Sequence, residues 1–123
     1  MSQTTGRRVL LIDDDAMDRA VLTEALQLQG YDVTGAADGR KGLDLFKPGS
    51  YDVVVTDLGM PELSGWEVIE GVRQVDGEVP VIVITGVATD EDVRRALRTG
   101  VTLLHKPTSI AELVSSIEAL ARR

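Results

Sequence analysis

The sequence predicts an α/β protein in which five parallel strands alternate with five helices. Three apolar runs lack polar alternation, as expected for strands that are buried on both faces: Val9–Ile12, Val53–Val55 and Val81–Ile84. Longer amphipathic stretches separate these runs, and connections of that length join parallel strands through right-handed crossovers. We therefore expect a doubly wound sheet that is covered by helices on both faces.

Two amphipathic stretches mark helices most clearly. The stretch after the first strand places four apolar residues on one helical face: Met17, Val21, Ala25 and Leu28. The last stretch has apolar residues at spacings of three and four: Ile110, Leu113, Val114, Ile117, Leu120 and Ala121. Two weaker apolar segments, Tyr31–Val33 and Val101–Leu104, complete the alternation as the second and fifth strands.

Capping residues predict where several helices begin and end. Three starts pair a hydroxyl with a carboxylate three residues later, the capping-box pattern: Ser64 with Glu67, Thr89 with Asp92, and Ser109 with Glu112. Asp15 is expected to cap the first helix, since its carboxylate can accept a backbone N–H. Gly30 and Gly100 stand where two helices should end.

The composition fits one globular domain. The chain has 123 residues, of which 43% are hydrophobic and 27% charged, and it has no cysteine. We expect a single domain over residues 1–123, a flexible tail over residues 1–7 and no effector domain after the last helix. The apolar runs are too short to cross a bilayer and the first residues are too polar for a signal peptide, so we expect a cytoplasmic location without direct membrane contact. The net charge of −7 argues against direct binding to nucleic acid.

Four of the five predicted strands are followed by polar residues. The first leads into Asp13 and Asp14, the third into Asp57, the fourth into Thr85 and the fifth into Lys106. Because the carboxyl ends of parallel strands meet at one edge of a sheet, we expect these side chains to lie together.

This residue set indicates magnesium and phosphoryl chemistry. Three adjacent carboxylates repel one another, and a hard divalent cation with oxygen ligands relieves that repulsion. Mg²⁺ and the Lys106 ammonium together balance the three carboxylates. Asp57 needs no general base, since an aspartate of ordinary pKa is ionised at neutral pH and can attack phosphorus directly. Positioning and charge neutralisation would supply the rest.

These residues belong to motifs that resemble the receiver domains of two-component response regulators. The motifs extend over nearly the whole chain: Val9–Asp15, Asp38–Gly39, Val53–Pro61, Ser64–Gly65, Pro80–Gly86 and Lys106–Pro107. The resemblance implies a flavodoxin-like (CheY-like) (βα)5 fold with strand order 2-1-3-4-5. It also implies a phosphoacceptor signalling domain, not an enzyme, whose donor is a histidine kinase or a histidine phosphotransfer protein.

The resemblance assigns a role to each matching residue. Asp57 would be the phosphoacceptor. Asp14, Asp57 and the backbone carbonyl of Gly59 would bind Mg²⁺, or alternatively Mn²⁺, and Asp13 would act mainly through water or hydrogen bonds. Lys106 would pair with the phosphoryl group.

The resemblance also concerns three positions that would signal whether Asp57 is phosphorylated. Thr85 would move to bond the phosphoryl oxygen and so signal occupancy. The bond between Lys106 and Pro107 is often cis in the family. Leu103 occupies the position of the usual aromatic switch residue, so we expect a different or weaker coupling of Thr85 to the surface.

Several alternatives stay open. A haloacid-dehalogenase-like phosphatase would also carry an acidic motif on the first strand, and a pseudo-receiver would only bind partners. The chain could be a stand-alone regulator or a part of a hybrid sensor kinase. A homodimer through the face of the fourth helix, fifth strand and fifth helix is a further option.

Overall fold

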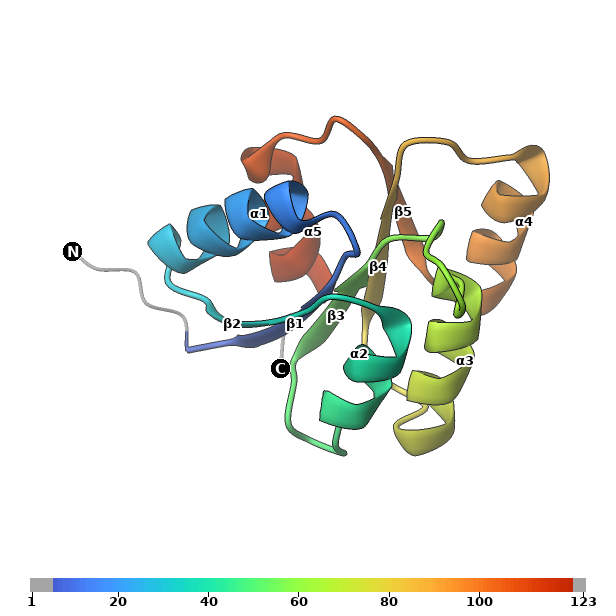
Figure 1. Cartoon of the computed structure of the whole chain (residues 1–123), viewed down its shortest axis with the longest axis horizontal. Coiled ribbons are helices and arrows are strands. Elements are labelled where there is room, and N and C mark those ends of the chain that lie inside the picture. The colour runs from blue at the N-terminus through green and yellow to red at the C-terminus, as the bar shows by residue number, and fades with distance from the viewer. Residues whose placement is uncertain (1–5, 121–123) are drawn as a thin grey trace.

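The computed structural model describes residues 6–120, in which one parallel sheet has the strand order β2-β1-β3-β4-β5. Figure 1 shows the five strands and the five helices that cover the sheet. Their bounds are β1 Arg8–Ile12, α1 Ala16–Leu28, β2 Asp32–Ala36, α2 Gly39–Leu45, β3 Val53–Thr56, α3 Gly65–Val75, β4 Val81–Thr85, α4 Asp90–Thr99, β5 Thr102–His105 and α5 Ile110–Leu120. The predicted (βα)5 fold and strand order are confirmed.

Parts of two predicted segments lie outside the described residues. These parts are residues 1–5 of the expected N-terminal tail and Ala121 of the last predicted helix. Of the rest of that tail, Arg7 forms an ion pair with Glu118 of α5.

The central strands send alternate side chains into two separate cores, which explains their apolar runs. Val9 and Leu11 of β1 lie in the core beneath α1 and α5, whereas Leu10 and Ile12 lie in the core beneath α2, α3 and α4. Figure 1 shows the corresponding division, with α1 and α5 on one side of the sheet and the other three helices on the opposite side. Both faces of the sheet are therefore closed to water.

The apolar stripe that marks α1 in the sequence is not the stripe that packs on the sheet. Met17, Val21 and Leu28 are 72%, 56% and 79% exposed. The helix packs instead through Leu26, which is fully buried, and Leu22, which is half-buried against the same core. The helix carries two neighbouring apolar stripes, and the crossover from β1 to β2 decides which one faces inward.

The predicted N-terminal caps are present, although at Ser109 the Glu112 carboxylate accepts from the Thr108 hydroxyl. At the end of α1 the prediction is off by one residue, because the C-cap is Gln29 and Gly30 follows it at φ 99°. Ser64 and Thr89 form complete capping boxes at the starts of α3 and α4. Asp15 caps α1 by accepting a hydrogen bond from the Asp18 backbone, and the Ser109 hydroxyl accepts one from the Glu112 backbone at the start of α5. Gly100 ends α4 in the left-handed region, at φ 73° and ψ 26°.

Strand register brings the candidate residues to one edge. Ile12 at the end of β1 pairs with Ala36 of β2 and with Thr56 of β3. The backbone N–H of Asp13 then donates to Ala36, and that of Asp57 donates to Ile12. The bond from Asp57 holds the two acidic loops next to each other, and the bond from Asp13 ties the first of them to the end of β2.

We expect Leu26→Ala and Leu28→Ala to separate the two stripes of α1. Leu26→Ala should lower the free energy of unfolding by about 2–5 kcal/mol, because it leaves a cavity in the core. Leu28→Ala removes the same atoms from an exposed position and should change it by less than about 0.5 kcal/mol. Urea unfolding of both variants measures the difference. Equal losses would contradict the burial of Leu26, and a larger loss for Leu28→Ala would mean that α1 packs on the sheet through the other stripe.

Candidate functional site

Three carboxylates gather at the carboxyl edge of the sheet, as the sequence predicts. Asp13, Asp14 and Asp57 each offer an oxygen atom, and these atoms all lie within 4.8 Å of one another. Asp13 is buried, Asp57 is half-buried and Asp14 is exposed to solvent. Such a cluster of oxygen ligands, open on one side, fits a hard divalent cation that keeps part of its water shell.

The Lys106 ammonium sits among these acids. Its Nζ atom lies 3.1 Å from Asp57 Oδ2, 3.2 Å from Asp18 Oδ2 and 3.7 Å from Asp13 Oδ2. Burial by itself would lower the pKa of Lys106, but the hydrogen bonds to Asp57 and Asp18 and the nearby charges raise the pKa above the ordinary value for lysine. The ammonium is therefore charged at neutral pH.

Asp13 carries an electrostatic penalty in this cluster. Burial raises its pKa above the usual range, and the charges of Asp57 and Asp18 raise it further. A backbone hydrogen bond from Asp15, at 2.9 Å, and the charge of Lys106 act in the opposite direction without compensating fully. Added positive charge at this site would relieve the remaining penalty.

Thr85 is buried at the end of β4 and is turned toward its own loop. Its hydroxyl donates to the carbonyl of Val87 at 2.9 Å and accepts from the Val87 backbone N–H at 3.3 Å. Thr85 lines an open cavity together with Asp57, Gly59 and Trp66. A shift of the hydroxyl toward Asp57 would therefore release the loop that leads into α4.

The loop after Asp57 is held close to the start of α3 by a glycine. The backbone N–H of Gly65 donates to the carbonyl of Leu58 at 2.8 Å. A Cβ atom on Gly65 would press against the carbonyl oxygen of Asp57 and lie 2.8 Å from the Leu58 Cα atom. Glycine is required here so that α3 can begin directly behind the acidic cluster.

The remaining predicted positions lie around β5. The peptide bond between Lys106 and Pro107 is cis, as the resemblance implies. Leu103 is half-buried and packs against the core beneath α3 and α4. The backbone N–H of Lys106 donates to the Thr85 carbonyl at 2.8 Å, so the lysine and the threonine are fixed side by side.

Sequence reasoning missed two contacts of this site. Asp18 lies on α1, not at a strand end, yet it shares Lys106 with Asp57. Asp18 lies in the first turn of α1, three residues after the Asp15 cap, and no sequence pattern connects it with Lys106. The Trp66 indole of α3 donates to Asp92 Oδ1 of α4 at 3.0 Å. Since the two residues are 26 positions apart, no local pattern signals that bond.

Comparison with known proteins identifies the family. The model of the response regulator receiver domain matches residues 9–118, which include every residue of the site. The chain belongs to the receiver domain family of response regulators. That family is not catalytic in itself, and neither of the alternative functions, the phosphatase or the pseudo-receiver, finds support.

Individual relatives agree with this assignment. The transcriptional regulatory protein PrrA of Mycobacterium tuberculosis is 38% identical over 120 residues, which are 97% of this chain and 52% of PrrA. The receiver domain thus spans about half the length of the curated relatives it matches. Since such relatives are named as transcriptional regulators, the expectation that nucleic acid is no partner finds no support in them.

Solved receiver domains have the same fold. Vibrio cholerae chemotaxis protein CheY4 superposes with a TM-score of 0.86 at 28% identity, over 94% of this chain and 99% of CheY4. The receiver domain of sensor histidine kinase PA1611 from Pseudomonas aeruginosa PAO1 gives 0.84 at 28% identity, over 95% of this chain and 98% of that one. The PA1611 structure has a magnesium ion coordinated in its active-site cleft.

We expect Asp13→Asn to stabilise the receiver domain at neutral pH in EDTA. The amide keeps an oxygen for the Asp15 N–H and removes a buried charge. Because the folded-state pKa of Asp13 is raised, wild-type stability from this group is greatest below the ordinary aspartate pKa of 3.8 and is lost as the pH rises through the folded value. The gain in stability should therefore shrink as the pH is lowered, which urea unfolding at several pH values measures.

Asp44→Asn, on an exposed position of α2, is the charge-matched control. A loss of stability in Asp13→Asn alone would contradict the expectation.

Proposed function

We propose that this receiver domain takes up a phosphoryl group on Asp57 from a phosphohistidine. The observation that carries the proposal is the 3.1 Å contact between Lys106 Nζ and Asp57 Oδ2 within a cluster that can also hold a cation. An ionised carboxylate at this place is a nucleophile, and a fixed ammonium beside it can neutralise the charge of the arriving group.

The transfer conserves atoms and electrons without any further reactant. A carboxylate oxygen of Asp57 attacks phosphorus, and an O–P bond forms as the P–N bond to the donor histidine breaks. The electron pair of that bond leaves with the imidazole nitrogen, which takes up a proton. The chain's own residues contribute position and charge, since little covalent chemistry is left for the protein to do. In this proposal the domain is no enzyme and assists only its own phosphorylation and dephosphorylation.

The oxygen ligands fit Mg²⁺, with Mn²⁺ as the alternative. Asp13, Asp14, Asp57 and the carbonyl of Gly59 are the groups that would hold it, Asp13 partly through water. Bound there, the ion would supply positive charge to the phosphoryl oxygens. The cluster of three acid oxygens within 4.8 Å and the raised pKa of Asp13 both support this assignment.

The proposed setting follows from the family and the charge. The partner would be a histidine kinase or histidine phosphotransfer protein, and a homodimer through α4, β5 and α5 is a further option. We infer one domain over residues 1–123 and a cytoplasmic location without direct membrane contact. None of the described helices is long and apolar enough to cross a bilayer. Direct contact with nucleic acid is not proposed for this domain.

The switch would run from Thr85 to α4. In this proposal Thr85 leaves Val87 to bond the new phosphoryl group, and the loop before the Thr89 cap is released. Leu103 has no ring to follow the threonine. The Trp66–Asp92 bond lies between α3 and α4 beside the same cavity and can respond to that movement.

Incubation with acetyl phosphate tests the acceptor role. We expect the intact mass to rise by one phosphoryl group in the presence of Mg²⁺, and to stay unchanged in EDTA. Asp57→Asn should show no adduct under either condition. An adduct that survives Asp57→Asn, or that forms equally well in EDTA, would contradict the proposal. No adduct on a folded wild-type chain would do so too.

Tryptophan fluorescence tests the switch, because Trp66 is the single tryptophan of the chain. We expect phosphorylation to change its emission, since the indole lines the same cavity as Asp57 and Thr85. Thr85→Val keeps the shape of the side chain but lacks the hydroxyl, so its phosphorylated form should show a smaller change. An equal change in Thr85→Val, at equal phosphorylation by mass, would exclude the threonine from the coupling.

A further inference from the structure

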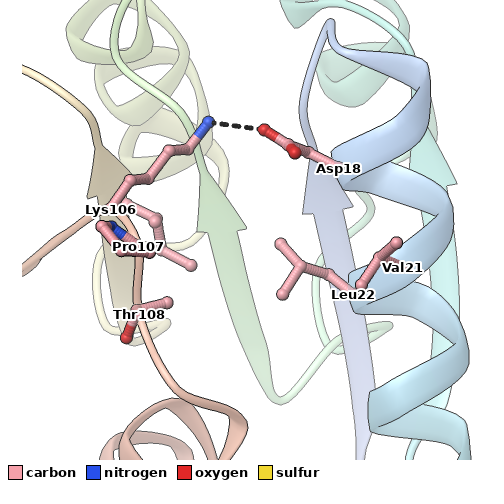
Figure 2. A pocket seen from close by; sticks show the side chains of 7 residues that line it. Asp18, Val21, Leu22, Lys106, Pro107 and Thr108 are labelled. Atoms are coloured by element: carbon pink, nitrogen blue, oxygen red, sulfur yellow. Dashed lines mark hydrogen bonds and ion pairs between the residues drawn. The ribbon is translucent and has the colours of Figure 1, made fainter.

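The carboxylate of Asp18 competes with the acceptor for Lys106. The Oδ2 atom of Asp18 is 3.2 Å from Nζ, and that of Asp57 is 3.1 Å from it, so the ammonium is divided almost equally between them. Figure 2 shows Lys106 reaching from the segment after β5 toward Asp18 on α1. Asp18 lies outside the motifs that carry the resemblance, the first of which ends at Asp15.

Asp18 is held in this place by the start of its helix. Its backbone N–H donates to the Asp15 cap at 3.0 Å, which fixes the first turn of α1. The side chain is 46% exposed, so its contact with Lys106 is partly screened by water. It borders an apolar pocket that is lined mainly by Val21, Leu22 and Pro107, and its carboxylate therefore faces few other polar groups there.

The charge of Asp18 acts against the acceptor site. It is not one of the three acids whose oxygens can share a cation. With Asp18 included, four carboxylates surround the Lys106 ammonium and the proposed cation, and the Arg19 guanidinium, which donates to the Asp13 carbonyl at 2.8 Å, adds a further positive charge beside them. An arriving phosphoryl donor is itself an anion, and it needs the same ammonium protons that Asp18 occupies.

We propose that Asp18 is a positioning residue that holds Lys106 back from the phosphoryl group and so slows phosphorylation of Asp57 by small anionic donors. The inference rests on the proposed acceptor function and adds a residue that sets its rate. Transfer from acetyl phosphate forms the O–P bond to Asp57 and releases acetate with the electron pair of the broken bond. During this step Lys106 has to exchange Asp18 for a phosphoryl oxygen.

The first test compares initial rates of phosphorylation by acetyl phosphate at saturating Mg²⁺. We expect Asp18→Asn to react about two- to fivefold faster than wild type, which is the range of a partly exposed ion pair. Glu24→Gln removes the same charge from an exposed position farther along α1 and should leave the rate unchanged. A rate for Asp18→Asn that is equal to wild type or slower would overturn the inference.

A double variant shows whether Asp18 acts through Lys106. In a Lys106→Met background the further change Asp18→Asn should leave the residual rate unaltered, because the shared ammonium is gone. If the acceleration persists there, Asp18 repels the donor directly and is no positioning residue.

A measurement without phosphorylation separates this inference from the proposed function. In EDTA, the ¹⁵N resonance and proton exchange of the Lys106 ammonium should change in Asp18→Asn and not in Glu24→Gln. An unchanged ammonium signal would overturn the ion pair even if Asp57 is phosphorylated. A chain that shows the change but accepts no phosphoryl group would overturn the acceptor function, and with it the effect on rate.

Discussion

The contact of one ammonium with several carboxylates is the interaction on which the site depends. Lys106 lies between 3.1 and 3.7 Å from three of them, and its backbone is bonded to the Thr85 carbonyl at the end of β4. Without that positive charge, the acids that β1 and β3 deliver to one edge would repel one another across a short distance. Burial is the main cause of the raised pKa of Asp13, and the charges of Asp57 and Asp18 add to it, so Lys106 offsets these effects only in part. Additional positive charge at this edge of the sheet would therefore stabilise the folded domain.

Most of this site could be predicted because parallel topology converts sequence order into position. Asp13, Asp57 and Lys106 follow strands and Thr85 ends one, and register brings the strand ends together. Asp18 could not be predicted by the same rule, since its contact depends on how far α1 leans over the end of the sheet. The sequence also could not predict which face of α1 packs on the sheet. The helix carries two apolar stripes, and hydrophobic periodicity cannot tell which one the crossover turns inward.

In the proposed switch, Leu103 stands at the position of the usual aromatic residue, and the signal would have to leave the site by another route. Leucine packs against the core beneath α3 and α4 and has no polar atom that could follow Thr85. A polar path exists nearby, in which the Trp66 indole bonds Asp92 inside the capping box that Thr89 begins. The guanidinium of Arg95 lies over the indole, 4.8 Å from the ring centroid, and fixes the ring between α3 and α4.

The two helical layers are therefore connected to the site around Asp57 by different contacts. On one side α1 is connected through Asp18 and Lys106, and on the other α4 is connected through Thr85 and its loop. The backbone N–H of Lys106 donates to the Thr85 carbonyl, so both connections start from neighbouring residues at the ends of β4 and β5. A phosphoryl group on Asp57 would compete for the ammonium and the hydroxyl together. One covalent change at the edge of a rigid sheet would then loosen a contact in each layer, although the cores beneath the helices stay packed.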